Sequence, residues 1–382
     1  YNRPTTLGIR FRGNHRLTEP AQREFTILEE TMRLQLRVTV VLLAGLMCLG
    51  AGSQLAAQPA AIVQHERWVT SLTFSADGNL LYTGGGESLQ YRPGDVKIWD
   101  TKTGALVASM DGSTSNVWSV ALSPDASKLA TSGYDGKITI WNVAERKPIA
   151  TVEKRKGWCR SLAFSPDGKM LASAGEDGQV TLWSMENQME IKSIKCHEAA
   201  IYDVAFSPDG ATLATASTDK TAKLFDWNAG TEKAKLEGHT DAVWAIKYAK
   251  NGQLLATCGA DRKVKIWDAA GKEQATLEGH KDWISNLTFS PDSGTIYTAS
   301  HDRTVRVWSV AEKKELGVIA GFRSTVWGVA VSPDNRLLAA GSHKDSIRVF
   351  DISTKNELFP HPAPEEKPAE KPAEKPAEKP AP

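Results

Sequence analysis

The 382-residue sequence predicts an all-β fold assembled from seven copies of one small unit. An aromatic residue closes each copy, and successive closing residues lie 42, 42, 42, 42, 41 and 42 positions apart. Each copy also contains short apolar runs of strand length that are separated by turn residues. These two observations predict a seven-bladed β-propeller of four-stranded antiparallel blades. The closing residues are Trp99, Trp141, Trp183, Phe225, Trp267, Trp308 and Phe350.

The four strands of a copy follow one another in a fixed order. In the run VWSVAL (117–122), β-branched and aromatic residues alternate with small ones, which favours a first strand. A Ser-Pro-Asp-Gly turn follows, as at 165–168, because proline presets φ, aspartate bonds nearby backbone and glycine accepts a positive φ. The second strand (171–174 in the same copy) is followed by a third that ends at the aromatic residue. A short apolar run such as 275–277 supplies the fourth strand.

The ends of the copies resemble the repeats of the WD-repeat family. Gly-His opens two copies, and Trp-Asp or Phe-Asp closes four of them. The resemblance extends from about residue 60 to residue 351, and the chain resembles an exported bacterial-type member of this family. It implies that a strand preceding the first copy completes the last blade, and residues 60–64 (AAIVQ) are the candidate. The matching pairs are Gly238-His239, Gly279-His280, Trp99-Asp100, Phe225-Asp226, Trp267-Asp268 and Phe350-Asp351.

The same resemblance implies a hydrogen-bonded network in each complete copy. It links the opening histidine, a second-strand threonine, the aspartate of the next turn and the third-strand tryptophan. We expect these groups to fix a turn rather than to catalyse, since they satisfy a buried imidazole and indole. Three copies lack the histidine and have Ser113, Arg155 or Phe322 instead. The network residues are His239, Thr257, Asp261 and Trp267; His280, Thr298, Asp302 and Trp308; and His197, Thr215 and Asp219.

A second set of aromatic residues lies three or five positions after the opening position of every copy. The resemblance places these residues where the innermost strand begins, on the narrow face around the central channel, which is the family's usual partner-binding surface. Tryptophan and tyrosine are favoured binding anchors, and Arg160 would project from the same zone as a charged contact. The alternative is that the rings only pack between blades or plug the channel. The set is Trp68, Trp118, Trp158, Tyr202, Trp244, Trp283 and Trp327.

Composition and motifs exclude several classes of function. The 46 basic residues balance 45 acidic ones, which argues against a nucleic-acid-binding protein. We find no nucleophile elbow, phosphate-binding glycine loop or paired metal-ligand spacing, so we expect no enzyme activity, cofactor or metal. His301 and His343 each follow a second strand, but two histidines make a poor zinc site. Cys159, Cys196 and Cys258 are expected to be buried free thiols, with one disulfide as the alternative.

The two ends of the chain predict segments outside the propeller. Residues 32–57 combine a basic start, an apolar run of about a dozen residues and a small-residue stretch, which is typical of a cleaved signal peptide. We therefore expect export to the periplasm or beyond the cell, with no stable membrane insertion after cleavage. An uncleaved anchor is the alternative. Residues 1–31 would be an extension absent from the mature protein, 58–359 the propeller, and 360–382 a disordered tail repeating Glu-Lys-Pro-Ala.

Together these features predict an exported, monomeric, non-catalytic scaffold that binds a protein or peptide on the narrow face of the propeller. Two other functions remain open at this point. One is a lectin-like propeller that binds a carbohydrate or another small ligand through ring stacking. The other is an enzyme or enzyme subunit acting on an envelope substrate, which would need polar groups with perturbed pKa values at the mouth of the channel.

Overall fold

A computed structural model describes residues 68–86, 93–152, 157–344 and 347–359. The chain divides into two units, Tyr1–Val63 and Gln64–Pro382, and all the described residues belong to the second. The expected signal peptide, the upstream extension, the candidate strand at 60–64 and most of the tail lie outside the described residues.

The described residues form 27 strands in seven antiparallel sheets, which we number as blades 1 to 7 in chain order. Blades 1 to 3 consist of β1 (Trp68–Phe74), β2 (Leu80–Gly86), β3 (Gly94–Asp100) and β4 (Leu106–Asp111); β5 (Val117–Leu122), β6 (Lys128–Gly133), β7 (Ile138–Asn142) and β8 (Lys147–Val152); and β9 (Cys159–Phe164), β10 (Met170–Gly175), β11 (Gln179–Ser184) and β12 (Glu190–Lys195).

Blades 4 to 7 continue the same pattern. They consist of β13 (Ile201–Phe206), β14 (Thr212–Ser217), β15 (Ala222–Asp226) and β16 (Thr231–Leu236); β17 (Val243–Tyr248), β18 (Leu254–Gly259), β19 (Lys263–Asp268) and β20 (Glu273–Glu278); β21 (Ile284–Phe289), β22 (Thr295–Ser300), β23 (Val305–Ser309) and β24 (Lys314–Ile319); and β25 (Val326–Val331), β26 (Leu337–Ser342) and β27 (Ile347–Asp351).

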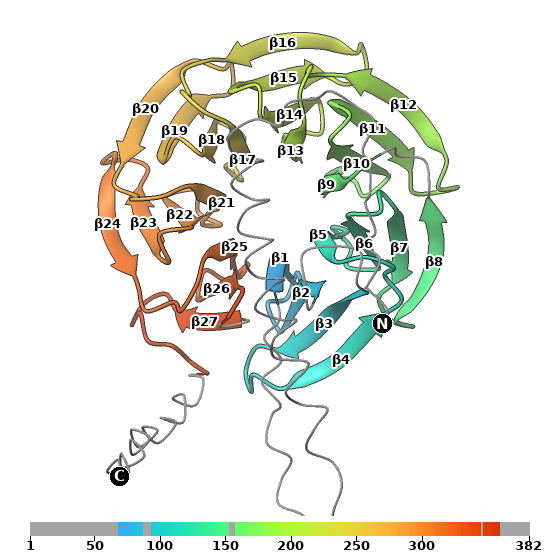
Figure 1. The fold of residues 1–382 in the computed structure, drawn as a ribbon, viewed down its shortest axis with the longest axis horizontal. Helices are drawn as coiled ribbons and strands as arrows, with labels where there is room; N and C mark the ends of the chain where they lie inside the picture. The colour runs from blue at the N-terminus through green and yellow to red at the C-terminus, as the bar shows by residue number, and fades with distance from the viewer. Residues whose placement is uncertain (1–67, 87–92, 153–156, 345–346, 360–382) are drawn as a thin grey trace, which may run out of the picture. The chain divides into compact units, whose positions relative to one another are not determined.

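The seven sheets stand around a central axis, with the first strand of each blade innermost and the last strand outermost (Figure 1). Six sheets have four strands in sequence order, and the described part of blade 7 has three. The predicted all-β, seven-bladed propeller is therefore confirmed. The described residues contain no helix, and so none of them forms a membrane-spanning helix.

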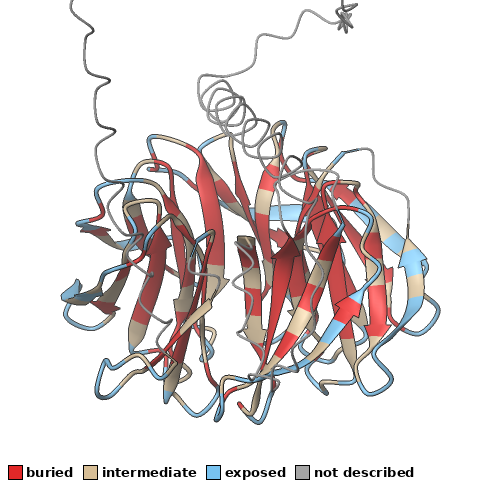
Figure 2. Cartoon of the chain, turned by 60° about the horizontal axis from the view of Figure 1, so that its bottom comes forward, coloured by how far each residue is buried: buried red, intermediate tan, exposed pale blue. Residues whose placement is uncertain are grey.

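The core of the propeller lies between neighbouring blades. Ile266 and Leu277 of blade 5 pack with Ile284 and Leu287 of blade 6, and each is at most 2% exposed. Similar clusters join the other blades, and Val69 and Leu72 of blade 1 pack with Ala339 and Val349 of blade 7. Figure 2 shows buried residues along the inner strands and exposed ones on the outer strands. Each sheet thus buries both of its faces against its neighbours.

A ladder of polar side chains joins the first strands of the first five blades. In blades 1 to 4, a side chain near the start of the first strand accepts a hydrogen bond from a backbone N–H in the first strand of the next blade. These bonds run from Val120 to Ser71 (3.1 Å), from Leu162 to Ser119 (3.2 Å), from Val204 to Ser161 (3.2 Å) and from Ile246 to Asp203 (2.9 Å). The first strand of each blade is an edge strand, and this inter-blade ladder satisfies donors that no neighbouring strand can reach.

The predicted Ser-Pro-Asp-Gly turns form as expected. The Ser165 hydroxyl donates to the Asp167 carboxylate over 2.6 Å and accepts from the backbone N–H of Met170 over 2.9 Å. Gly168 has a φ of 70°, in the left-handed region that glycine tolerates best. The hydrogen bond from Ser165 is the main cause that lowers the pKa of Asp167. In the corresponding turns, similar bonds lower the pKa values of Asp77 and Asp125 to about 2.

The three predicted free thiols lie inside this framework. Cys159, Cys196 and Cys258 are buried and form no disulfide. Burial raises the pKa of the Cys196 thiol to about 12. A group with so high a pKa is almost entirely in its unreactive thiol form at neutral pH. We therefore assign these cysteines to packing.

The inter-blade core generates a stability prediction. Leu255 is fully buried, and we expect Leu255→Ala to lower the free energy of unfolding by about 2–5 kcal/mol, because the deletion leaves a cavity. Leu106→Ala, at a leucine that is 49% exposed, is the matched control and should change it by less than about 0.5 kcal/mol. Chemical denaturation of both variants measures the difference. Equal effects would contradict an inter-blade core at Leu255.

Candidate functional site

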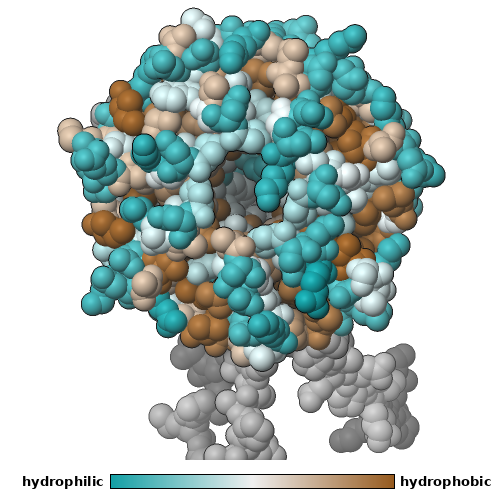
Figure 3. Space-filling view, turned by 180° about the vertical axis from the view of Figure 1, so that it is seen from behind, coloured by the Kyte–Doolittle hydropathy of each residue, from teal (hydrophilic) through white to brown (hydrophobic). Residues whose placement is uncertain are grey.

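The seven aromatic residues singled out from the sequence all lie at the start of a first strand or immediately before it. We call Trp68, Trp118, Trp158, Tyr202, Trp244, Trp283 and Trp327 the aromatic ring. Seen from the side opposite to Figure 1, the propeller is hollowed at its centre, with mostly hydrophilic and near-neutral side chains around the opening (Figure 3).

A β-bulge explains why one position of each first strand differs from the rest. In blade 5, Val243 pairs with Gly259 and Ala245 pairs with Cys258, so Trp244 is the extra residue. A bulge leaves its extra residue unpaired and re-aims the side chain. In the seven blades the extra residue is Thr70, Trp118, Arg160, Tyr202, Trp244, Ser285 and Trp327.

The remaining aromatic residues compensate for the blades whose bulge carries no aromatic side chain. Blades 1, 3 and 6 have Thr70, Arg160 and Ser285 at the bulge, and each has a tryptophan two residues earlier. The two hydroxyl residues bond to the next blade: Thr70 donates to the carbonyl of Val117 (2.7 Å) and Ser285 to that of Val326 (2.6 Å). Every blade therefore contributes a ring at or just before its bulge.

The rings contact one another across blades. Ring centroids are 5.9 Å apart for Trp68 and Trp327, 5.7 Å for Tyr202 and Trp244, and 5.1 Å for Trp244 and Trp283. Trp118 of blade 2 lies 6.0 Å from Trp327 of blade 7, although blade 1 stands between those blades. Contacts at these distances and tilts are favourable. They join six of the rings into two groups, one of Trp68, Trp118 and Trp327 and the other of Tyr202, Trp244 and Trp283, and we call the whole arrangement the layer.

Arg160 lies within this layer, which differs from the expectation that it projects toward a partner. Its side chain is only 6% exposed. The guanidinium carbon is 4.8 Å from the centroid of Trp118, 4.5 Å from that of Trp158 and 4.4 Å from that of Tyr202. The guanidinium stacks well on aromatic faces, and the ion pair with Glu176 is long, at 3.9 Å. Arg160 is thus an internal cation that holds three rings together.

His301 contacts three rings, as Arg160 does, but a different set of three. Its imidazole lies 5.4 Å from Trp244, 5.4 Å from Trp283 and 4.8 Å from Trp327. Burial lowers the pKa of His301 to about 4, so the imidazole is neutral at physiological pH. Its Nε2 atom is buried and has no hydrogen-bond partner within the described residues.

Two further residues that follow second strands join the layer. Tyr134 lies 5.2 Å from Trp118 and 4.3 Å from Trp158, and His343 lies 4.0 Å from Trp68. The sequence had drawn attention to the two histidines only as weak metal ligands. The described residues contain no group of three or more potential metal-ligating side chains. The signal that could have placed these residues in the layer is their shared position directly after a second strand.

The exposure of the ring residues divides them into two groups. Trp244 is 8% exposed and packs with Ala242 and Ala260, so it serves mainly as a core residue of the layer. The other six aromatic residues are half-buried and keep part of their surface accessible. Partner binding by the ring stays a prediction, and the half-buried residues are the ones available for it.

The opening histidines form the hydrogen-bonded networks that the sequence suggested. Nδ1 of His239 lies 2.8 Å from the Asp261 carboxylate, and Nε2 lies 2.7 Å from the Thr257 hydroxyl, which also accepts from the Trp267 indole over 2.9 Å. The same bonds join His280, Asp302, Thr298 and Trp308, and join His197, Asp219 and Thr215 in blade 4, where Phe225 replaces the tryptophan.

These networks close the turn between the second and third strands and offer no reactive group to a substrate. The three imidazoles are at most 7% exposed. Burial is the largest cause that lowers the pKa values of His197 and His280, whereas hydrogen bonds from neighbouring groups lower those of Asp219, Asp261 and Asp302 against the opposing effect of burial. His197 and His280 are therefore held neutral between a carboxylate and a hydroxyl.

The environment of His301 generates a pH prediction. An unfolded histidine titrates near pH 6.5, and the pKa of folded His301 is about 4. Between these values only the unfolded state takes up the proton, so the free energy of unfolding falls as the pH drops through this window. Protonation of His301 in the unfolded state alone lowers the free energy of unfolding by roughly 3 kcal/mol across this window.

We expect His301→Phe to lose less stability than the wild type between about pH 7 and about pH 4.5, as measured by urea unfolding at both values. Phenylalanine keeps the edge contacts with the three tryptophans but does not titrate. An unchanged loss of stability in the variant would show that His301 is not buried in the layer.

Comparisons with known proteins agree with this architecture. Residues 58–100, 104–142 and 146–184 match the family model of the WD domain, G-beta repeat. Residues 200–367 match a model described as the IFT122 first beta-propeller. Among curated proteins, pre-mRNA-processing factor 19 homolog 2 of Arabidopsis thaliana is 40% identical over 67 residues, which is 18% of this chain and 12% of that protein.

The two family models match non-overlapping parts of the chain, and the described residues of each part fold into the blades given above. Propellers of this kind commonly mediate protein–protein interactions and typically have no catalytic activity of their own. The chain is a seven-bladed β-propeller that contains WD40 repeats.

Proposed function

We propose that this propeller is a non-catalytic scaffold that binds a protein or peptide partner through the half-buried members of the aromatic ring. The observation that carries the proposal is the layer of rings contributed by all seven blades, which Arg160, Tyr134 and His301 join together. An aromatic anchor on a rigid support loses little conformational entropy on binding. The cation Arg160 and the imidazole of His301 already lie between the rings, which favours a partner that covers the layer over a small cation that enters it.

The support for this function is the combination of rigidity and partial exposure. Trp244 and Arg160 are buried and fix the layer from within, whereas Trp118 and Trp283 keep accessible surface. Interface hot spots are typically tryptophan, tyrosine or arginine residues, each surrounded by contacts that exclude water. A partly accessible layer of such residues fits a macromolecular surface better than a solute that needs an enclosing pocket.

The proposal is tested by removing accessible rings without removing the layer's core. We expect the double variant Trp118→Ala, Trp283→Ala to lose a partner captured by the wild-type propeller from soluble and envelope extracts of the native cells, with affinity falling by a factor of about 30 or more. Trp227→Ala is the matched control, because Trp227 is also half-buried but bonds to the Gly210 turn, away from the ring.

Quantitative mass spectrometry of the captured proteins, with thermal melting of each variant, provides the measurement. Equal capture by the double variant and the wild type, with only a lower melting temperature, would assign the ring to packing. A glycan array run with the same variants distinguishes the lectin-like alternative, in which saccharide binding rather than protein capture depends on Trp118 and Trp283.

We also propose that the protein is exported after cleavage of the segment 32–57, as its basic, apolar and small-residue regions indicate. Mass analysis of the N-terminus of the native protein should find a mature start near Gln58. A start within residues 1–31 would contradict this proposal. Because the propeller can bind a partner in any compartment, failure here leaves the binding proposal intact.

A further inference from the structure

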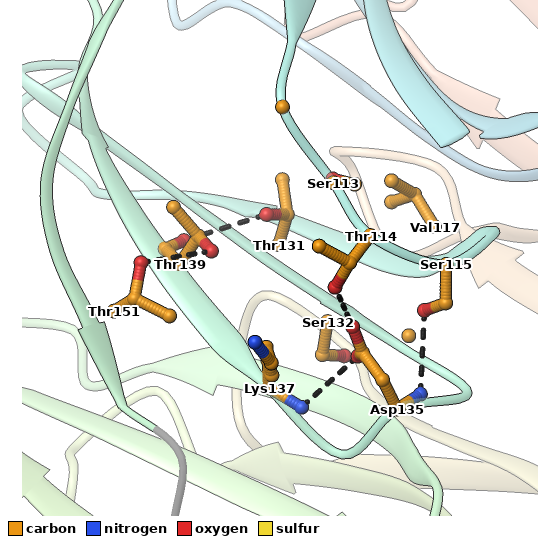
Figure 4. A pocket seen from close by; sticks show the side chains of 12 residues that line it. Ser113, Thr114, Ser115, Val117, Thr131, Ser132, Asp135, Lys137, Thr139 and Thr151 are labelled. Atoms are coloured by element: carbon orange, nitrogen blue, oxygen red, sulfur yellow. Dashed lines mark hydrogen bonds between the residues drawn. The ribbon is translucent and has the colours of Figure 1, made fainter. Parts of the chain in front are cut away.

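A polar cavity of about 180 Å³ opens in blade 2, at the position where blades 4, 5 and 6 have a histidine. Ser113 takes the place of His197, His239 and His280, the opening histidines of blades 4, 5 and 6. Blade 7 also lacks the histidine, but the buried ring of Phe322 fills the space there. In blade 2 the serine side chain is too short to do so, and a cavity results (Figure 4).

A second short side chain in blade 2, in place of a long basic one, enlarges the cavity. In blades 4, 5 and 6 a basic residue of the third strand pairs with a glutamate of the fourth strand beside the opening histidine. The pairs are Lys223 with Glu232 (2.8 Å), Lys265 with Glu273 (2.9 Å) and Arg306 with Glu315. In blade 2 the basic residue is replaced by Thr139, whose hydroxyl lies 3.4 Å from that of Thr151, and both residues line the cavity.

The groups that hold the imidazole in the other blades are still present in blade 2. Thr131 accepts a hydrogen bond from the Trp141 indole over 2.9 Å, as Thr257 does from Trp267 in blade 5. Asp135 accepts from the backbone N–H of Lys137 over 3.1 Å, as Asp261 does from Lys263. The hydroxyl of Thr114 bonds to the same carboxylate oxygen that binds the histidine elsewhere.

Thr131 and Asp135 both line the cavity, so the hydroxyl and the carboxylate that hold the imidazole in the other blades face an empty space at the corresponding position (Figure 4). In blade 5 the corresponding oxygen of Asp261 accepts two hydrogen bonds, one from His239 Nδ1 and one from the backbone N–H of Thr240. A carboxylate oxygen can accept more than one bond. Asp135 can therefore receive an imidazole N–H while it keeps the bond from Thr114.

We propose that the blade 2 cavity is a binding site for an imidazole ring, supplied either as a small molecule or as the histidine side chain of a partner. One ring nitrogen donates to Asp135 and the other bonds to the Thr131 hydroxyl, which reproduces the bonds of His197, His239 and His280. The other serine and threonine hydroxyls that line the cavity can hydrogen-bond to polar groups attached to the imidazole ring. This site is separate from the aromatic ring, and its existence does not depend on the proposed scaffold function.

The indole N–H of Trp141 provides a local reporter, because it donates to the Thr131 hydroxyl that would contact the ligand. We expect a titration of the intact protein with imidazole to shift the Trp141 indole resonance in a two-dimensional NMR spectrum in a saturable manner. Ser113→His should abolish this shift, since the new side chain fills the space as in blades 4 to 6. Thr131→Val should weaken binding at least tenfold.

The outcomes are distinguishable from loss of folding. Ser113→His restores the residue found in the complete blades and should raise the melting temperature, so an absent shift in a more stable variant supports the site. An unchanged shift in Ser113→His, or no saturable shift in the wild type, would overturn the proposal.

A second titration distinguishes the two sources of the ring. Saturable binding of a blocked Gly-His-Gly peptide more tightly than imidazole, with no binding of Gly-Ala-Gly, supports a histidine side chain of a partner. Binding of imidazole without binding of the histidine peptide supports a small molecule instead.

Discussion

The hydrogen bonds between the first strands of neighbouring blades set the geometry on which the other features depend. Each first strand is the inner edge of its sheet, so the backbone N–H groups on its unpaired side have no neighbouring strand to bond. Side chains of Ser71, Ser119, Ser161 and Asp203 satisfy these donors from the preceding blade. The ladder fixes the spacing of the strands, and the bulges immediately before it then direct the aromatic side chains toward one another.

Residues within the layer of rings also hold it together. Arg160 stacks on Trp118, Trp158 and Tyr202, and His301 packs against three tryptophans on the opposite side. Packing and binding are compatible roles for such a layer, because buried members restrict the rotamers of the exposed ones. A binding surface that is rigid before the partner arrives avoids part of the entropy cost of association.

Much of the fold follows from local patterns in the sequence. The Ser-Pro-Asp-Gly turns, the strand order and the histidine networks depend on residues that lie close together in each copy, and repetition makes them visible. The bulge at Trp118, Tyr202 and Trp244 could not be predicted, because it depends on the register between two strands. For the same reason the sequence placed Arg160 at the surface rather than between rings. The cavity of blade 2 was also missed, since it results from two separate substitutions, at Ser113 and Thr139, whose side chains share one space.

The packing of Val69 and Leu72 against Ala339 and Val349 has a further consequence for the mechanics of the ring. At the other six junctions the backbone passes from one blade to the next, so a separating force is shared between the chain and the core. Between blades 7 and 1, within the described residues, only side chains carry that force. The strength of this junction therefore depends on the packing of buried side chains. Within the described residues, loosening this packing would separate blade 7 from blade 1 without breaking any strand pairing inside a blade.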